Sequence, residues 1–279
     1  MKTTITVICE NTVGTPLPII GEHGQSLFIQ DGSITLYDTG QGLGLLNNMK
    51  LMGKDPNLID RIILSHGHYD HTGGLMDLLK NRASEVSVYC HRDAFKEKIA
   101  LYEMPGKNIE VPIGTRFSAA DYEKAGARLC WTEGYAEVSG MKVLSDVNRP
   151  VGWKTSDARL KQKEAGEIVD DPFNDDLSLL LMTDSGPVVL LGCAHAGIVE
   201  ILDDFSNKTG VKEFHAVIGG THLESAPDDY FQKAIDSLEK FNVQKIGTSH
   251  CTGFRRSAAL AAHFKDRFVP VSAGLVIEF

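Results

Sequence analysis

Short β-type runs, in which apolar and polar residues tend to alternate, recur through the first third of the chain. A period of two is typical of β-strands that bury one face, and the β-branched residues in these runs favour the same structure. Glycine-containing turns, such as Asp31-Gly32, separate the runs. The pattern predicts five strands, over residues 4–9, 25–29, 34–37, 61–64 and 87–90.

Other segments repeat apolar residues every three or four positions, which indicates helices with one buried face. Four helices are predicted, over residues 42–51, 75–83, 229–241 and 257–264. Strand-like runs return in the second half, over residues 177–182, 188–191, 216–218 and 245–247. In the order of these elements along the chain, strands and helices cluster separately. This order favours an α/β fold of two packed sheets flanked by helices over one doubly wound sheet.

The chain has 279 residues, of which 42% are hydrophobic, and is therefore long enough to bury one large core. Segments 32–40 and 186–195 resemble one another weakly, as in a fold built from two related halves. We therefore expect a single domain over residues 1–279.

Residues 146–176 differ from the rest of the chain in composition. They include Pro150, Gly152, Pro172 and a Lys-Gln-Lys-Glu run among few apolar positions. An irregular segment of this length inside a compact domain usually has a function or is disordered. We predict a long loop that forms a flap near the functional site; the alternative is a mobile surface loop.

The charge balance and the cysteines limit the class of protein. Lys and Arg number 28 against 37 Asp and Glu, a net charge of −9, which argues against broad binding to nucleic acid or anionic membranes. The chain has no apolar run of about 20 residues and no signal-peptide core at its start. Five scattered cysteines without a Cys-x-x-Cys pair favour reduced thiols. We expect a cytoplasmic protein with a small-molecule substrate and no nucleic-acid or membrane partner; the oligomeric state is open.

The densest chemistry lies in residues 65–74, Ser-His-Gly-His-Tyr-Asp-His-Thr-Gly-Gly. Four of these side chains can bind a metal ion, namely His66, His68, Asp70 and His71. They follow a predicted strand, whose end would direct them into one small volume. Imidazole nitrogens and a carboxylate suit zinc, and also iron, manganese or nickel. The alternative, a polar loop that merely carries histidines, is disfavoured by this density.

The spacing His-x-His-x-Asp-His in this loop resembles the signature of the metallo-β-lactamase-fold superfamily, and matching elements extend from Asp38 to Phe279. The resemblance implies a four-layer αββα sandwich, in which two mixed sheets are flanked by helices. It also implies a centre with two divalent metal ions, with zinc expected first and iron or manganese as alternatives. Members include β-lactamases, glyoxalase II, RNA-processing nucleases, phosphodiesterases and diiron flavoproteins, so the reaction stays open.

Two further residues match superfamily motifs. Asp38, in Leu-Tyr-Asp-Thr-Gly, matches a residue that does not bind the metal itself but orients a metal-binding histidine and fixes the tautomer of that imidazole. The alternative for Asp38 is an ordinary turn residue. His250, in Ser-His-Cys-Thr-Gly, matches the last motif, which implies that it joins Asp70 and His71 at the second ion.

The chain departs from the superfamily pattern at one ligand. The superfamily carries a further His some twenty residues before the strand end at Cys193, whereas residues 173–176 here read Phe-Asn-Asp-Asp. We expect His195 to supply the missing imidazole to the first ion, alongside His66 and His68.

Three neighbouring residues are candidates for the same centre. Cys193 aligns with a bridging Asp of many relatives and could ligate as a thiolate, although a buried cysteine without a metal is the commoner situation. Asp175 or Asp176 could replace the absent His as an oxygen ligand, and the favoured alternative for both is an exposed loop carboxylate.

Two more histidines are expected at the rim of the site. His222, in Val-Ile-Gly-Gly-Thr-His-Leu, follows a predicted strand and is a candidate substrate contact or proton shuttle. His23, in Gly-Glu-His-Gly, is a candidate substrate contact. Asp70 and His222 are the catalytic candidates, because a positioned carboxylate or imidazole can transfer the proton of a nucleophile.

The longer motifs narrow the resemblance. Four motifs together resemble a group of prokaryotic metal-dependent hydrolase-like proteins: the loop at 65–75, Gly-Cys-Ala-His-Ala-Gly-Ile, Gly-Gly-Thr-His-Leu and Ser-His-Cys-Thr-Gly. Some members are named 7,8-dihydropterin-6-methyl-4-(β-D-ribofuranosyl)aminobenzene-5′-phosphate synthase. Diiron flavoproteins are disfavoured because they carry Glu in place of the second His, whereas His68 is present here. A β-lactamase is disfavoured by the missing signal peptide.

We predict a metal-dependent hydrolase that acts on a small phosphorylated substrate through a water activated by the metal ions. The first alternative is a transferase, similar to dihydropteroate synthase, that joins a dihydropterin diphosphate to an arylamine. The second alternative is a non-catalytic sensor that binds metal and a ligand.

Overall fold

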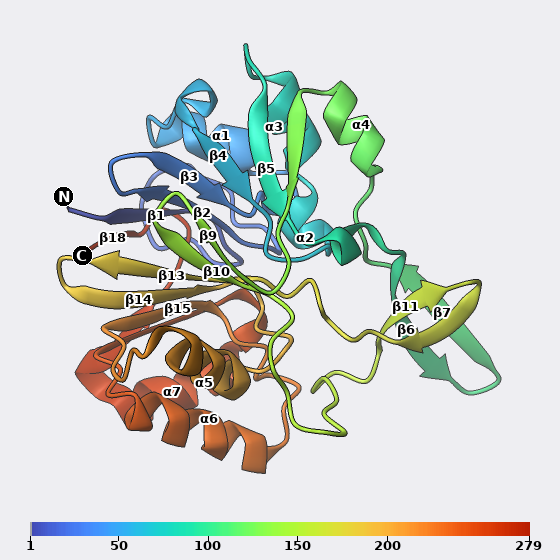
Figure 1. The fold of residues 1–279 in the computed structure, drawn as a ribbon, viewed down its shortest axis with the longest axis vertical. Coiled ribbons are helices and arrows are strands. Elements are labelled where there is room, and N and C mark those ends of the chain that lie inside the picture. Colours follow the sequence, from blue (N-terminus) through green and yellow to red (C-terminus); the bar gives the residue numbers. More distant parts are fainter. Residues whose placement is uncertain (1) are drawn as a thin grey trace.

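The computed structural model describes residues 2–279 and contains two seven-stranded sheets that pack face to face, with helices on both outer sides (Figure 1). The first has the order β18 (Val276–Glu278), β1 (Thr4–Cys9), β2 (Ser26–Gln30), β3 (Ile34–Tyr37), β4 (Arg61–Ile63), β5 (Val86–Cys90) and β8 (Ala127–Trp131). The second has the order β17 (Phe268–Pro270), β16 (Lys245–Ser249), β15 (Ala216–Gly220), β14 (Gly186–Leu191), β13 (Ser178–Thr183), β10 (Met141–Leu144) and β9 (Tyr135–Val138). The expected αββα sandwich is confirmed.

The two outer layers are helical. The first sheet is covered by α1 (Leu45–Leu51), α3 (Leu75–Lys80) and α4 (Ala119–Lys124), and the second by α5 (Ile198–Thr209), α6 (Asp228–Lys240) and α7 (Phe254–Phe264). A single turn, α2 (Tyr69–Thr72), lies in the histidine-rich loop. Four 3-10 turns complete the helices, η1 (Pro56–Leu58), η2 (Arg92–Phe95), η3 (His250–Thr252) and η4 (Lys265–Arg267).

Continuous apolar runs in the central strands explain why the sheets pack on both faces. Along β13, Leu179 and Leu181 join the core between the two sheets, whereas Leu180 joins the core beneath the helices. Successive side chains of a strand point to opposite faces, so both sides of this strand are buried. Each fully buried aliphatic side chain contributes about 1.5–3 kcal/mol to the free energy of folding.

Strand direction brings the functional turns to one edge of the sandwich. In the first sheet β3, β4, β5 and β8 run parallel, and in the second β14, β15, β16 and β17 do so. The carboxyl ends of parallel strands meet at the same edge of a sheet, where sites in such folds commonly lie. His66 after β4 and His195 after β14 are neighbours, so the edges of both sheets share one site.

A third, four-stranded antiparallel sheet projects from one side of the sandwich (Figure 1). It has the order β12 (Glu167–Asp170), β11 (Leu160–Glu164), β6 (Lys98–Met104) and β7 (Lys107–Pro112), and we call it the β-arm. The prediction of one long loop over residues 146–176 was therefore wrong in part, because this segment contains the β11–β12 hairpin. Most of the hairpin's side chains are partly or fully exposed, so it lacks the apolar alternation that marks a half-buried strand.

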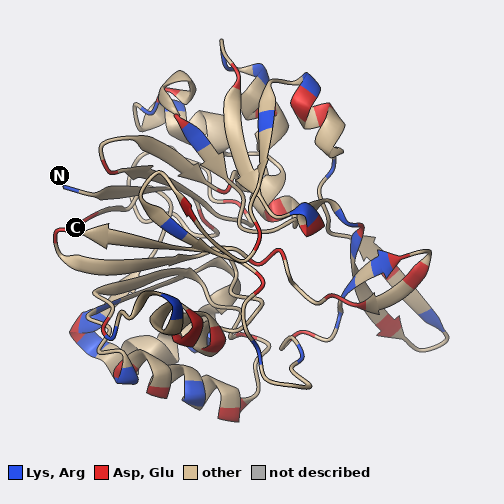
Figure 2. Cartoon of the chain, viewed as in Figure 1, with Lys and Arg blue, Asp and Glu red and all other residues tan. Residues whose placement is uncertain are grey.

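Acidic and basic side chains both occur on the outer helices and on the β-arm (Figure 2). Among residues 2–279, no helix combines the length and the apolar character that crossing a membrane requires.

Candidate metal centre

The polar side chains of one site come from the turns that follow five strands. These are Asp38 after β3, His66 after β4, His195 after β14, His222 after β15 and His250 after β16. Three of them have left-handed backbones, with φ of 63° at Asp38, 48° at His222 and 49° at His250. Residues other than glycine rarely adopt this region, and those that do gather at functional sites.

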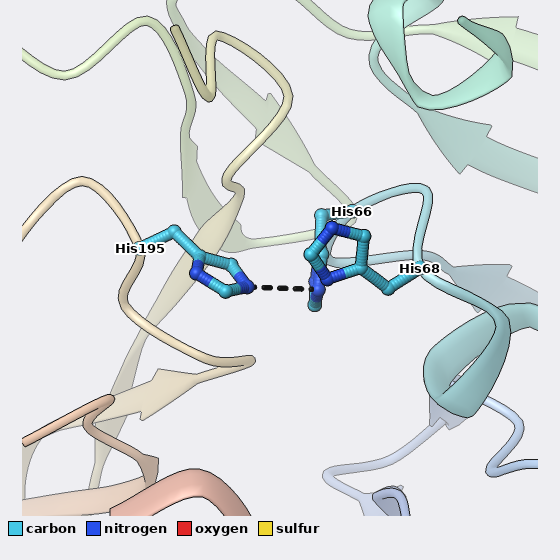
Figure 3. A group of neighbouring side chains, drawn as sticks. All are labelled: His66, His68 and His195. Atoms are coloured by element: carbon cyan, nitrogen blue, oxygen red, sulfur yellow. Dashed lines mark hydrogen bonds between the residues drawn. The ribbon is translucent and has the colours of Figure 1, made fainter. Parts of the chain in front are cut away.

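Three imidazoles meet at the centre of the site, from His66, His68 and His195 (Figure 3). The Nε2 atoms of His66 and His195 lie 3.3 Å apart, and the donor nitrogens of all three rings lie within 4.8 Å of one another. Two nitrogens bound to one tetrahedral zinc at about 2.0–2.1 Å are roughly 3.3–3.4 Å apart. The buried Nε2 of His68 and Nδ1 of His195 have no hydrogen-bond partner within the described chain. The arrangement therefore fits a shared metal ion.

Burial keeps these three imidazoles neutral. It lowers the pKa of His66 and of His195 well below the usual range, and neighbouring imidazoles add to the effect. It lowers the pKa of His68 to about 3, with the charge of Lys98 as a second cause. A neutral imidazole keeps a lone pair, so these rings are available to a metal ion at neutral pH.

The imidazole of His71 is held in position by the carboxylate of Asp38. Its Nδ1 lies 2.7 Å from Oδ2 of Asp38, and Oδ1 of Asp38 accepts the backbone N–H of Ser65 at 2.7 Å. Burial lowers the pKa of His71, but the charge of Asp38 outweighs it and raises that pKa to about 9. The carboxylate stabilises positive charge at this ring, whether a proton or a metal ion at Nε2 supplies it.

Asp70 lies between two imidazoles. Its Oδ2 is 3.1 Å from Nε2 of His23 and 3.1 Å from Nε2 of His250. The other ring nitrogen of His250 lies 2.9 Å from Oδ1 of Asn11. Burial disfavours the charge of Asp70, yet hydrogen bonds from His23 and His250 hold its pKa well below the usual range. The ionised carboxylate suits a cation.

Two thiols lie beside these histidines. The Sγ of Cys193 is 3.2 Å from Nε2 of His71, which places this thiol at the centre of the site. The donor atoms of Cys193, His250 and Cys251 lie within 4.8 Å of one another. The sequence-based prediction missed Cys251, although its position directly after His250 at a strand end was a usable signal.

Asp175 and Asp176 are buried, so the expectation of exposed loop carboxylates was wrong. Asp175 binds Nζ of the buried Lys98 at 3.0 Å and accepts the backbone N–H of Gly67 at 2.9 Å. Asp176 accepts the N–H of Ala196 at 2.7 Å, and burial raises its pKa to about 7. Both carboxylates hold the loops that carry the histidines, and neither belongs to a group of potential metal donors.

His222 lies against His195, with ring centroids 4.4 Å apart. Its Nδ1 lies 3.4 Å from Oγ of Ser156 and 3.3 Å from Oγ of Ser225. Burial lowers the pKa of His222 to about 4, so the ring is neutral at pH 7. The structure thus places His222 beside the imidazole of His195.

A cavity of about 350 Å³ opens over the histidines and is lined in part by the β-arm. Tyr102 of β6 and Arg159, which precedes β11, form one wall, with the guanidinium 5.3 Å from the ring centroid. Arg159 also donates to Asp157 through Nε at 2.8 Å and Nη2 at 2.6 Å. Asp157, Arg159 and Leu160, within the segment predicted as a flap, therefore line the cavity, although the sequence had singled out none of them individually.

Comparison with known proteins agrees with this geometry. Residues 20–204 match the model of the metallo-beta-lactamase superfamily. The chain is 32% identical over 285 residues to a Methanocaldococcus jannaschii protein named 7,8-dihydropterin-6-methyl-4-(beta-D-ribofuranosyl)-aminobenzene-5'-phosphate synthase, and the match covers 99% of this chain and 96% of that protein. This protein belongs to the metallo-β-lactamase superfamily, whose members are mostly metal-dependent enzymes.

Two solved structures extend the comparison. Tm1679, described as a metal-dependent hydrolase of the beta-lactamase superfamily, is 27% identical with a TM-score of 0.85 and 99% of both chains covered. YhfI from Bacillus subtilis is 14% identical with a TM-score of 0.57, covering 100% of this chain and 99% of its own. At that identity YhfI shows a shared fold only.

Proposed function

We propose that this protein is a metal-dependent hydrolase of a small phosphorylated molecule. One observation carries the proposal: the nitrogens of His66, His68 and His195 converge at a cavity of about 350 Å³ whose wall includes Arg159. Such a cavity admits a small molecule, and a guanidinium is a preferred partner of phosphate oxygens.

The donors suit two divalent ions. His66, His68 and His195 would hold the first, and Asp70, His71 and His250 would hold the second. Nitrogen-rich donors favour zinc, with iron or manganese as alternatives. When bound, the ions would supply a Lewis acid for a phosphoryl oxygen and lower the pKa of a water toward neutrality.

The chain's own side chains would bind and orient the substrate. Asp157 accepts from two nitrogens of Arg159 and holds the guanidinium in place, which leaves Nη1 for a phosphate oxygen. Tyr102 presents an aromatic surface that fits a flat ring. His23, whose side chain is 53% exposed, would contact the substrate at the mouth of the cavity.

His222 and Asp70 differ in how they could serve proton transfer. His222 is neutral and lines the cavity, so it can donate a hydrogen bond to the substrate or pass a proton. Asp70 is ionised and bound by two imidazoles, which favours metal binding over general base catalysis. We therefore assign the proton shuttle to His222.

A transferase is the second candidate, and the 32% identity to the Methanocaldococcus jannaschii synthase supports it. The nitrogen of an arylamine would attack the methylene carbon of a dihydropterin diphosphate. The carbon–oxygen bond to the diphosphate would break, a carbon–nitrogen bond would form, and the amine would lose a proton. The same site would bind the leaving diphosphate instead of activating water.

Two assays separate these candidates. Purified protein with a measured metal content is incubated with a panel of phosphoesters, thioesters and lactones, and separately with a dihydropterin diphosphate and an arylamine. Release of phosphate from a phosphoester supports the hydrolase, and coupling without net hydrolysis supports the transferase. Bound metal with turnover in neither assay would point to the non-catalytic sensor.

The double variant His66→Ala with His68→Ala serves as the control in both assays. It removes two donors of the first ion and should abolish whichever activity the wild type shows. Full metal content with full turnover in this variant would refute both candidates.

A reducing compartment fits the chemistry of the site. All five cysteines are free, and two of them lie among the metal donors. We therefore place the enzyme in the cytoplasm. The net charge of −9 separately supports our proposal of a small-molecule substrate and of no nucleic-acid or membrane partner.

A further inference from the structure

Two free thiols meet at the end of the second sheet. Cys193 follows β14 and Cys251 follows β16, the strands on either side of β15. The Sγ of Cys251 lies 3.6 Å from the backbone oxygen of Cys193. Neither cysteine is in a disulfide.

The backbone of β15 makes room for the sulfur of Cys251. A Cβ atom at Gly220 would lie 2.7 Å from this sulfur and 2.5 Å from the backbone oxygen of Gly192, so no larger residue fits without a shift. The backbone N–H of His222 donates to the same sulfur at 3.3 Å. The backbone of Gly220 and of His222 thus positions the sulfur of Cys251 at the site, where this sulfur accepts a hydrogen bond.

His250 completes a group of three donors. Its Nδ1 faces Oδ1 of Asn11 at 2.9 Å, which orients Nε2 toward the site. The donor atoms of Cys193, Cys251 and His250 all lie within 4.8 Å of one another. Ligands of one tetrahedral ion at metal–sulfur distances of about 2.3 Å and metal–nitrogen distances of about 2.0–2.1 Å are roughly 3.3–3.8 Å apart, so this group can close on one ion with small shifts.

We propose that Cys193 and Cys251 join His250 as ligands of the second ion, which makes this site sulfur-rich, with its remaining position open to Asp70, His71 or substrate. Two thiolates and an imidazole select zinc and other thiophilic divalent ions over magnesium or manganese. The inference rests on the proposed function in assuming that the centre holds metal. It goes further in assigning Cys251 as a ligand and in defining the class of ion.

Cobalt(II) provides the test, because sulfur-bound cobalt absorbs in the near ultraviolet by charge transfer and any tetrahedral cobalt absorbs in the visible. Reduced, metal-free protein titrated with cobalt should show both absorptions. Cys251→Ser and Cys193→Ser should each lose about half of the near-ultraviolet band, and the double variant all of it. Cys130→Ser, on β8 and outside every donor group, is the matched control and should keep the full band.

The outcomes separate this inference from the proposed function. Visible absorption with a near-ultraviolet band that survives Cys251→Ser would overturn the assignment of Cys251 and leave the metal enzyme intact. Absence of both absorptions in the wild type would remove the metal centre altogether.

A second measurement needs no variant. Zinc-loaded wild type is treated with an alkylating reagent, digested, and its modified cysteines are identified by mass spectrometry. Zinc should protect Cys193 and Cys251 relative to the metal-free protein while the labelling of Cys130 stays unchanged. Equal labelling of Cys251 with and without zinc would contradict the proposal.

Discussion

The Nδ1 atom of His71 lies 2.7 Å from Oδ2 of Asp38, and both side chains are fully buried. This contact directs Nε2 of His71 toward the centre, 3.3 Å from Nε2 of His250 and 3.2 Å from Sγ of Cys193. Asp38 thus acts on the centre through an imidazole, and its charge compensates a cation that it does not touch.

Asp38→Asn should weaken metal binding by about 10–100-fold, because a neutral amide no longer stabilises positive charge at His71. Competition between the protein and a zinc chelator measures this affinity. Asp229→Asn is the control, since that carboxylate lies exposed on α6 and should leave the affinity unchanged. Equal affinities in Asp38→Asn and the wild type would show that Asp38 has no role in the centre.

His195→Ala should reduce the zinc content by one ion per chain, because the first ion would keep only His66 and His68. Elemental analysis of protein purified without added chelator measures the loss. His263→Ala changes a histidine on α7 that belongs to no donor group and should keep the wild-type content. If His195→Ala retained every ion, another residue would have to be the missing ligand.

The strands and helices with a regular apolar pattern were predictable, whereas the β-arm was not. Strands such as β13 bury side chains on both faces, which leaves an apolar run as a clear signal in the sequence. In the β-arm, charged residues pair between strands: Lys161 with Asp170 on the neighbouring strand β12, and Lys163 with Glu110 on β7, on the far side of β6. Such pairs look like solvated loop residues in the sequence. The helix α5 had a usable signal in Ile198, Ile201, Leu202 and Phe205, which are all buried.

The centre itself was predictable where motif residues follow strands directly, as with His66 and His250. Lys98 was not predictable, because lysine is almost never fully buried unless a carboxylate elsewhere in the chain compensates its charge. Its partners Asp171 and Asp175 lie more than seventy residues away, at separations of 73 and 77 positions. That long-range pairing also explains why the two loop carboxylates were expected at the surface.

Lys98→Met should destabilise the protein by about 3–5 kcal/mol, because it leaves two buried carboxylates without a counter-charge. Lys98 binds Asp171 at 2.7 Å and Asp175 at 3.0 Å, and all three side chains are buried. Chemical denaturation measures the loss. The variant Lys98→Met with Asp171→Asn should recover part of it. A single variant as stable as the wild type would mean that the three charges are not coupled.

The cost of Lys98→Met should shrink as the pH falls. In the wild type, burial opposes the charge of Asp175, but Lys98 keeps its pKa below the ordinary value. This lowered pKa contributes stability above the unfolded-state pKa of about 3.9, and the contribution is lost as the pH falls through the folded-state pKa. Without Lys98 the buried carboxylates would take up protons at higher pH, which relieves the variant. Melting temperatures of both proteins, measured from about pH 8 to about pH 5, should therefore converge, and a constant difference would contradict this account.

Arg159→Met should raise the KM for a phosphorylated substrate at least tenfold while changing kcat much less. The guanidinium lies on the cavity wall beside Tyr102 and offers a charge-assisted hydrogen bond of about 1.5–3 kcal/mol to a bound phosphate. Methionine keeps most of the length of the side chain, so the packing against Tyr102 is largely retained. Arg92→Met is the matched control, because that guanidinium also stacks on an aromatic ring, Trp131, but lines no part of the cavity. A loss confined to kcat would instead place Arg159 at the reacting atoms, since an interaction made only in the transition state lowers kcat without raising KM.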